Sequence, residues 1–170
     1  GEILKFSKIK NFKYINVDLP PLSYISEQYL SKCVGRSKVS GYFNTKNLKK
    51  IKISELKNIS VLCSWQIEKL YGKIDLFVNF ISFQEMEPEI VKNYLNIVSK
   101  LRPKYILLRN LREGRQIKSK KRMGVKRQTT PEHYKIFLKK KYKLLSTNVT
   151  PFAHKTYDDF HSELILFEKR

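Results

Sequence analysis

Residues 74–81 read IDLFVNFI, and this almost continuously apolar stretch decides the fold. Such a run is typical of a strand covered on both faces in a parallel sheet. Apolar residues then recur at helical spacing over 90–101, with Pro88 suited to the first turn and Pro103 ending the helix. A second apolar run, YILL, occupies 105–108. This strand, helix, strand succession predicts two parallel strands joined by a right-handed crossover.

Upstream of this unit, the sequence predicts further strands. Residues 12–17 (FKYINV) are rich in β-forming side chains, and the prolines at 20–21 prevent the strand from continuing. Residues 59–63 (ISVLC) predict the next strand, and residues 66–71 a short helix or turn. The Lys-rich segment 36–57 has no clear period, so we assign it no element.

A helix is predicted between these two strands. Ser23 is suited to cap its start, the helix should run to about Cys33, and Gly35 is a natural stop. Three apolar residues are expected to share one face of this helix: Ile25, Tyr29 and Leu30.

The C-terminal part predicts a loop, a helix and a hairpin. Residues 112–127 hold eight Lys or Arg and few core-forming side chains, so residues 112–128 are expected to form a mobile basic loop. Pro131 is suited to the first turn of a helix that runs to about Lys140. Two further strands, over 142–149 and 162–167, suggest an antiparallel pair at the edge of the sheet.

Length and charge limit the class of protein. A chain of 170 residues that is 41% hydrophobic fits a single globular domain, 1–170. The formal charge of +20 implies a surface that attracts phosphates, acidic glycans or anionic lipid. No apolar run is long enough to span a bilayer, and two cysteines without metal or redox spacing favour a cytoplasmic location. We predict no metal site.

Polar residues that follow the predicted strands are the candidates for function. Ser82, Gln84 and Glu85 come just after the central strand, and Asp18 follows the first strand. Ligands of open α/β sheets bind beyond the carboxyl ends of the strands. A carboxylate in the place of Asp18 commonly accepts hydrogen bonds from both ribose hydroxyls of an adenosine cofactor, although Asp18 is equally suited to a turn.

Five stretches together resemble the sugar O-methyltransferase family of S-adenosylmethionine-dependent methyltransferases. They are VDLPP at 17–21, SWQIEKL at 64–70, DLFVNFISFQEM at 75–86, YLNIVSKL at 94–101 and HSELILFEKR at 161–170. The resemblance covers nearly the whole chain. It implies a Rossmann-like α/β fold: a seven-stranded, mostly parallel sheet with a terminal antiparallel hairpin, in three α/β/α layers.

The resemblance also implies roles for individual residues. Asp18 would hold the ribose of S-adenosylmethionine, and Ser64 and Trp65 would flank the adenine together with Cys63, although Trp65 suits a core position equally well. Asn79 and Ser82 would line the pocket near the sulfonium. Methyl transfer to a hydroxyl group also needs a base. The candidates for this catalytic role are Glu85 and His161.

One feature departs from the family pattern. The family has a first strand and a Gly-rich loop before the first helix, and here Gly1 would be the last glycine of that loop. A sheet that lacks its middle strand leaves backbone groups unpaired, at about 1 to 3 kcal/mol each. We therefore expect the sequence to be part of a longer polypeptide, or another segment to supply the missing strand.

Three functions remain open at this point. The first is an O-methyltransferase that acts on a sugar or glycan hydroxyl, with the basic loop contacting an acidic acceptor. The second is a nucleic-acid methyltransferase or RNA-binding protein, which the charge and the many Tyr and Phe favour. The third is a non-catalytic remnant with the methyltransferase fold.

Overall fold

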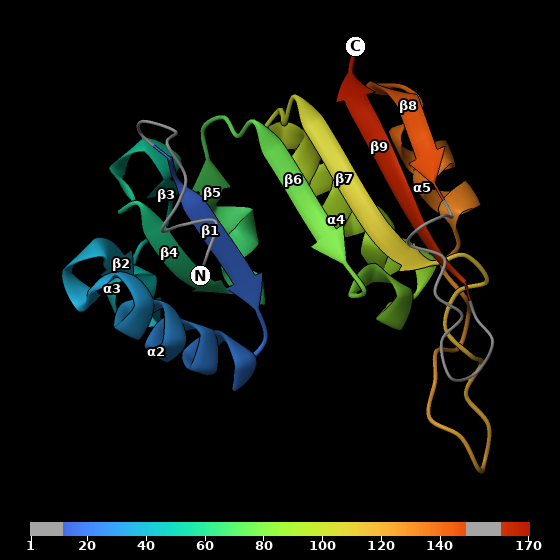
Figure 1. Ribbon diagram of the computed structural model, residues 1–170, viewed down its shortest axis with the longest axis horizontal. Helices are drawn as coiled ribbons and strands as arrows, with labels where there is room; N and C mark the ends of the chain where they lie inside the picture. The colour runs from blue at the N-terminus through green and yellow to red at the C-terminus, as the bar shows by residue number, and fades with distance from the viewer. Residues whose placement is uncertain (1–11, 149–160) are drawn as a thin grey trace. The chain divides into compact units, whose positions relative to one another are not determined.

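The computed structural model describes residues 12–148 and 161–170, and the chain divides into two compact units (Figure 1). Unit 1 is Gly1–Gly72 and unit 2 is Lys73–Arg170. The prediction of a single domain is not tested by this division and stays a prediction.

Unit 1 contains a parallel sheet of three strands with the order β1-β4-β2. The strands are β1 (Tyr14–Asp18), β4 (Ile59–Cys63) and the short β2 (Val39–Ser40). All five residues of β4 are buried, as expected for the middle strand. The strands predicted over 12–17 and 59–63 are confirmed. A second parallel pair joins β3 (Ile51–Lys52) to β5 (Leu70–Tyr71).

The predicted helix is α2 (Leu22–Val34), and Gly35 ends it in a left-handed conformation with φ 94°. The prediction that Ser23 caps this helix is wrong. Pro21 holds the N-cap position, and Ser23 lies buried inside the first turn. The predicted apolar face is also wrong in part, because Leu30 is buried whereas Ile25 and Tyr29 are 55% and 58% exposed.

The segment left unassigned forms several very short elements. They are the 3₁₀ turns η1 (Arg36–Lys38) and η2 (Ile53–Glu55), the one-turn helix α3 (Tyr42–Thr45), and the strands β2 and β3. The segment expected as a short helix or turn is the 3₁₀ helix η3 (Ser64–Lys69), followed by β5. Elements of two to four residues are too short to show a hydrophobic period, which is why the sequence did not reveal them.

Unit 2 contains a four-stranded sheet with the order β6-β7-β9-β8. Its strands are β6 (Leu76–Phe80), β7 (Tyr105–Leu111), β8 (Tyr142–Asn148) and β9 (Ser162–Lys169). Strands β6 and β7 are parallel, and β9 is antiparallel to both β7 and β8. The parallel unit and the terminal antiparallel pair are both confirmed, with β8 at the edge of the sheet.

Helices α4 (Pro88–Lys100) and α5 (Pro131–Leu138) lie on the same face of this sheet (Figure 1). Together they cover a core that includes Val91, Leu95, Ile106, Leu108, Tyr134 and Phe167. The expectation that β6 is covered on both faces is wrong. Its alternate residues Leu76, Val78 and Phe80 are 50%, 45% and 47% exposed, and the single turn η4 (Phe83–Glu85) follows the strand.

The basic segment 112–128 has hydrogen bonds of its own. Two backbone hydrogen bonds join its first and last parts. The Val125 amide donates to the Gln116 carbonyl, and the Lys118 amide donates to the Val125 carbonyl. The Lys126 amide donates to Glu87 Oε1 at 3.1 Å, which ties the segment to the start of α4. Whether the segment is mobile stays a prediction.

The α/β class with mostly parallel pairing is confirmed. The described strands divide among three sheets, of three, two and four strands. The seven-stranded sheet that the resemblance implied stays a prediction. Across 12–148 and 161–170, none of the helices has the length and apolar character needed to cross a membrane.

Candidate functional site

In unit 1, the predicted cofactor-side residues meet at the carboxyl ends of β1 and β4. The parallel register pairs Asp18 directly with Cys63. Ser64 and Trp65 follow Cys63 immediately, in η3. The structure therefore brings Asp18, Ser64 and Trp65 to one end of the same sheet, as the sequence predicted.

The turn after β1 holds the Asp18 side chain. Asp18 Oδ1 accepts a hydrogen bond of 2.7 Å from the backbone amide of Leu19. The Leu19 carbonyl in turn accepts from the Ser23 amide at 3.0 Å, in the first turn of α2. One carboxylate oxygen thus fixes the orientation of Asp18, and the other can accept a bond from a ligand hydroxyl.

Trp65 borders a cavity of about 240 Å³. The cavity lies between the strand ends and α2, with Pro20, Ser23, Tyr42, Phe43 and Cys63 among its lining residues. Trp65 is 52% exposed, so it is not a core aromatic residue. Its ring meets the edge of the Tyr42 ring at a centroid distance of 6.2 Å. An exposed indole beside an aromatic cavity is suited to contact a flat heterocycle.

Gln66 fixes the turn that carries Trp65. Its buried side chain accepts a bond from the Cys63 amide at 2.9 Å and donates to Thr45 Oγ1 at 2.9 Å. Sequence reasoning missed Gln66. The available signal was its place three residues after the end of a strand, where a Gln side chain caps the first turn.

In unit 2, a chain of side-chain amides, two of them buried, occupies the carboxyl ends of β6 and β7. Asn79 Oδ1 accepts from the Phe83 amide at 3.0 Å and from Asn110 Nδ2 at 3.4 Å. Asn110 Oδ1 accepts from the Gln84 amide at 3.2 Å, and Gln84 Oε1 accepts from the Leu111 amide at 2.8 Å. Gln84 and Asn110 are 3% and 2% exposed. The predicted residue Asn79 therefore holds the backbone of this edge in place.

The backbone between β6 and η4 is strained at Ile81, whose φ is 65°. A β-branched residue rarely adopts this left-handed conformation, and such strain tends to occur at functional sites. The Ile81 amide donates to the Arg109 carbonyl at 2.7 Å, which holds the turn against β7. Ser82 follows Ile81 and is exposed at the same end of the sheet.

His161 lies at the start of β9, next to the end of β7, and Glu113 holds its ring. His161 Nδ1 is 2.7 Å from Glu113 Oε1, and the His161 amide donates to Glu113 Oε2 at 2.8 Å. Partial burial raises the pKa of Glu113, but the hydrogen bonds from the side chain and backbone of His161 outweigh it and lower that pKa below its usual value. A carboxylate on Nδ1 leaves Nε2 to accept a proton. Sequence reasoning missed Glu113, since 48 residues separate the two.

The second candidate base, Glu85, lies at the same end of the unit 2 sheet. Its Oε2 is 3.4 Å from Arg115 Nε, an ion pair without hydrogen-bond geometry. Its Oε1 accepts from Gln84 Nε2 at 3.4 Å. Both oxygens of Glu85 therefore contact protein groups.

The predicted residues thus form two groups, one in each unit. Asp18, Ser64 and Trp65 belong to unit 1, and the unit 2 group consists of Asn79, Ser82, Glu85 and His161. Gly1 lies outside the described residues. Among the described His, Cys, Asp and Glu side chains, no group of three or more is placed to hold a metal ion.

Solved structures similar to this chain include a methyltransferase. The 1,6-didemethyltoxoflavin-N1-methyltransferase of Burkholderia thailandensis, with bound 1,6-didemethyltoxoflavin and S-adenosylhomocysteine, superposes over 93% of this chain and 72% of its own, at 10% identity and a TM-score of 0.52. LepI in complex with SAM superposes over 99% of this chain and 46% of its own, at 9% identity and a TM-score of 0.50. No family model and no curated protein matches the sequence. The chain therefore has the α/β fold of the methyltransferases.

Proposed function

We propose that this protein is an S-adenosylmethionine-dependent methyltransferase that acts on a sugar or glycan hydroxyl. The observation that carries the proposal is the His161–Glu113 pair at the carboxyl end of the unit 2 sheet, the end where open α/β sheets bind ligands. The acceptor class rests on the sequence resemblance to the sugar O-methyltransferases.

The residues of unit 1 fit the adenosine part of the cofactor. Asp18 would hold the ribose hydroxyls, and Trp65 and Ser64 would contact the adenine. The cavity of about 240 Å³ that Trp65 lines supports the role of Trp65, and the pairing of Asp18 with Cys63 places Asp18 at the same strand ends. In unit 2, Asn79 and Ser82 would line the methionine side of the cofactor.

The cofactor, when bound, supplies an electrophilic methyl group on a positively charged sulfur. His161 Nε2 would accept the proton of the acceptor hydroxyl, while Glu113 holds the ring and stabilises the imidazolium that results. With its side chain 34% exposed, His161 is open to an acceptor. Glu85 is the second candidate base, but its contacts with Arg115 and Gln84 favour a role in orienting the acceptor.

Cofactor binding tests the first part of the proposal. Calorimetric titration of the full chain with S-adenosylhomocysteine should give measurable heat. Trp65→Ala and Asp18→Asn should each weaken binding, by about tenfold for one lost stacking or hydrogen-bonded contact. The matched control for Trp65→Ala is Tyr71→Ala, which changes another half-exposed aromatic residue. The matched control for Asp18→Asn is Asp75→Asn, which changes an aspartate at the amino end of the unit 2 sheet. Absence of heat from the unmodified chain would favour the non-catalytic remnant.

Methyl transfer tests the second part. The chain should transfer a tritiated methyl group from S-adenosylmethionine to a panel of glycans and nucleotide sugars. Transfer to RNA or DNA alone would refute the acceptor class and leave the cofactor assignment standing.

A further inference from the structure

The end of the unit 2 sheet opposite His161 carries a cluster of cationic side chains. It is formed by three segments, 100–104, 139–143 and 168–170, which together contain nine Lys or Arg and one Glu. We call this cluster the basic end: Lys100, Arg102, Lys104, Lys139, Lys140, Lys141, Lys143, Lys169 and Arg170. All nine side chains are exposed.

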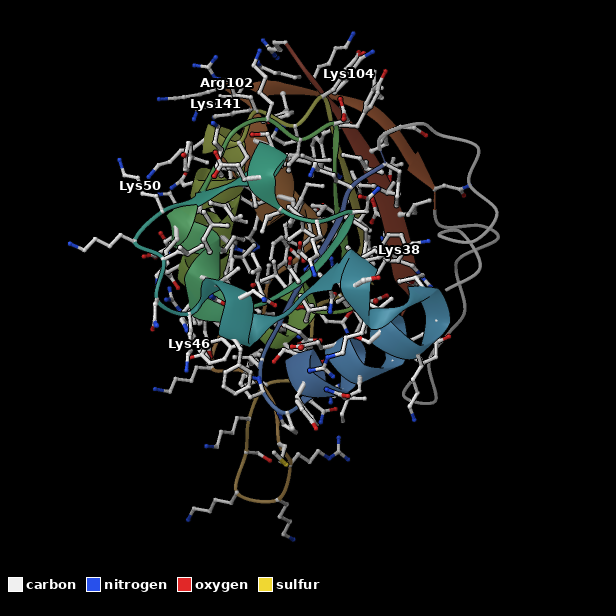
Figure 2. The ribbon with its side chains drawn as sticks, turned by 90° about the vertical axis from the view of Figure 1, so that its left-hand side faces the viewer. Lys38, Lys46, Lys50, Arg102, Lys104 and Lys141 are labelled. Atoms are coloured by element: carbon white, nitrogen blue, oxygen red, sulfur yellow. The ribbon has the colours of Figure 1, made fainter. Side chains whose placement is uncertain are left out.

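Hydrogen bonds hold the three segments together. The Lys169 amide donates to the Lys104 carbonyl at 2.9 Å, and the Arg170 amide donates to the Lys141 carbonyl at 3.0 Å. Tyr142 Oη donates to the Pro103 carbonyl at 3.2 Å. Figure 2 shows Arg102, Lys104 and Lys141 at this one end. The basic end is therefore one surface, although its residues are far apart in the sequence.

Cations far outnumber carboxylates at this end in the described part of the chain. Within the three segments the one carboxylate, Glu168, pairs with Lys143 at 2.8 Å, and that hydrogen bond is the main reason for the lowered pKa of Glu168. Asp75, just before β6, lies at the same end of the sheet. By contrast, the basic residues at the flanks of the 112–128 segment meet carboxylates: Arg115 pairs with Glu85, and Arg127 with Glu89. Charge complementarity thus calls for an external polyanion at the basic end.

Helix termini explain only part of this clustering. Lys100 and Lys139 complement the negative ends of α4 and α5, which is a common structural role for basic residues. Arg102 does not fit that explanation. Its φ is 52°, the left-handed conformation in which a chain following a helix usually has Gly or Asn. Arg102 is therefore a cation at a position where the backbone favours glycine.

We propose that the basic end binds the phosphate backbone of a nucleic acid, at a surface separate from the proposed methyl-transfer site. Strand β7, seven residues long, separates the two ends by about 20 Å. Within the segments 100–104, 139–143 and 168–170 no large apolar side chain is exposed, because Leu101 and Tyr142 are buried, and the exposed Leu76 and Leu144 only border the surface. A membrane-inserting surface would present such side chains among its cations. Lysines and arginines spread over several segments suit sequence-independent phosphate contacts.

Fluorescence anisotropy with a labelled 20-base-pair RNA duplex of arbitrary sequence tests this surface. The full chain should bind, and the affinity should fall steeply with added salt. The triple variant Arg102→Gln, Lys104→Gln, Lys141→Gln should bind about tenfold more weakly or worse and show a shallower salt dependence, by about 2 to 3 units in the log–log slope. The matched control, Lys118→Gln, Lys120→Gln, Lys121→Gln, removes the same charge from the 112–128 segment and should bind nearly as well as the unmodified chain.

Arg102→Gly separates loss of contact from loss of folding. Glycine suits the backbone at this position, so this variant should unfold at a higher temperature and yet bind the duplex more weakly. Equal losses in the two triple variants, no binding by the unmodified chain, or binding only to phosphatidylserine vesicles would each overturn the proposal. Titration with S-adenosylhomocysteine tests the proposed function separately, because the duplex assay contains no cofactor.

Discussion

The two ends of the unit 2 sheet satisfy their polar groups in different ways. At the carboxyl end, His161 pairs with Glu113, Arg115 with Glu85, and the amides of Asn79, Gln84 and Asn110 bond to one another and to the backbone. At the amino end, the three segments of the basic end hold nine cations and one carboxylate, Glu168, and Asp75 also lies at this end. Internal pairing fixes a geometry, as a reaction site requires, whereas unpaired charge on a surface is available to a partner.

The largest expected effect concerns His161, the proposed base at the carboxyl end. His161→Ala should lower the rate of methyl transfer by about 10²- to 10⁴-fold, because the acceptor hydroxyl would lose its proposed base. The pH profile of kcat should change in Glu113→Gln as well, since Glu113 orients the ring. His133→Ala is the matched control, as His133 caps α5. A similar fall in both histidine variants would contradict the assignment.

The next effect concerns stability at the same end. Asn110→Ala leaves the buried Gln84 amide without its acceptor and should lower the free energy of unfolding by about 1 to 3 kcal/mol. Denaturant titration measures this change. Asn96→Ala, on the exposed side of α4, should change stability by less than about 0.5 kcal/mol. If both variants lose an equally small amount of unfolding free energy, the amide network does not stabilise the carboxyl end of the unit 2 sheet.

At the amino end of the unit 2 sheet, replacing Arg102 by glycine should stabilise the fold. Arg102→Gly relieves the left-handed backbone, and its smaller cost in chain entropy leaves a net gain of about 0.5 kcal/mol. Thermal unfolding checks this result, with Lys104→Gly, at a position without positive φ, as the destabilised control. A loss of stability in Arg102→Gly would mean that the Arg102 side chain itself supports the fold.

The smallest effect is the pH dependence of the His161–Glu113 pair. The pKa of Glu113 is lowered in the folded state, so its stabilising contribution is present above its usual value of 4.5 and is lost as the pH falls through the lowered value. The difference in unfolding free energy between the unmodified chain and Glu113→Gln should therefore be larger at pH 6 than at pH 3. Urea titrations at both pH values measure it, and a difference that does not change with pH would contradict the pairing.

Patterns repeated over many residues determined the main elements from sequence alone. The run over 74–81, the helical period over 90–101 and the prolines at 88 and 131 each predicted an element that the structure contains. The same patterns located Asp18, Trp65, Asn79 and His161 near strand ends, because a polar residue after an apolar run marks the point where a strand leaves the core.

Contacts between distant residues were decided by the tertiary structure. No local pattern joins Glu113 to His161, Gln66 to Thr45 or Lys104 to Lys169, since each pair meets only when separate strands and turns come together. The exposure of one side of β6 also depended on which neighbouring elements cover it. An apolar run in the sequence does not show which elements those are. The sequence therefore determined what each strand is, and the packing of strands and helices decided which side chains meet at its two ends.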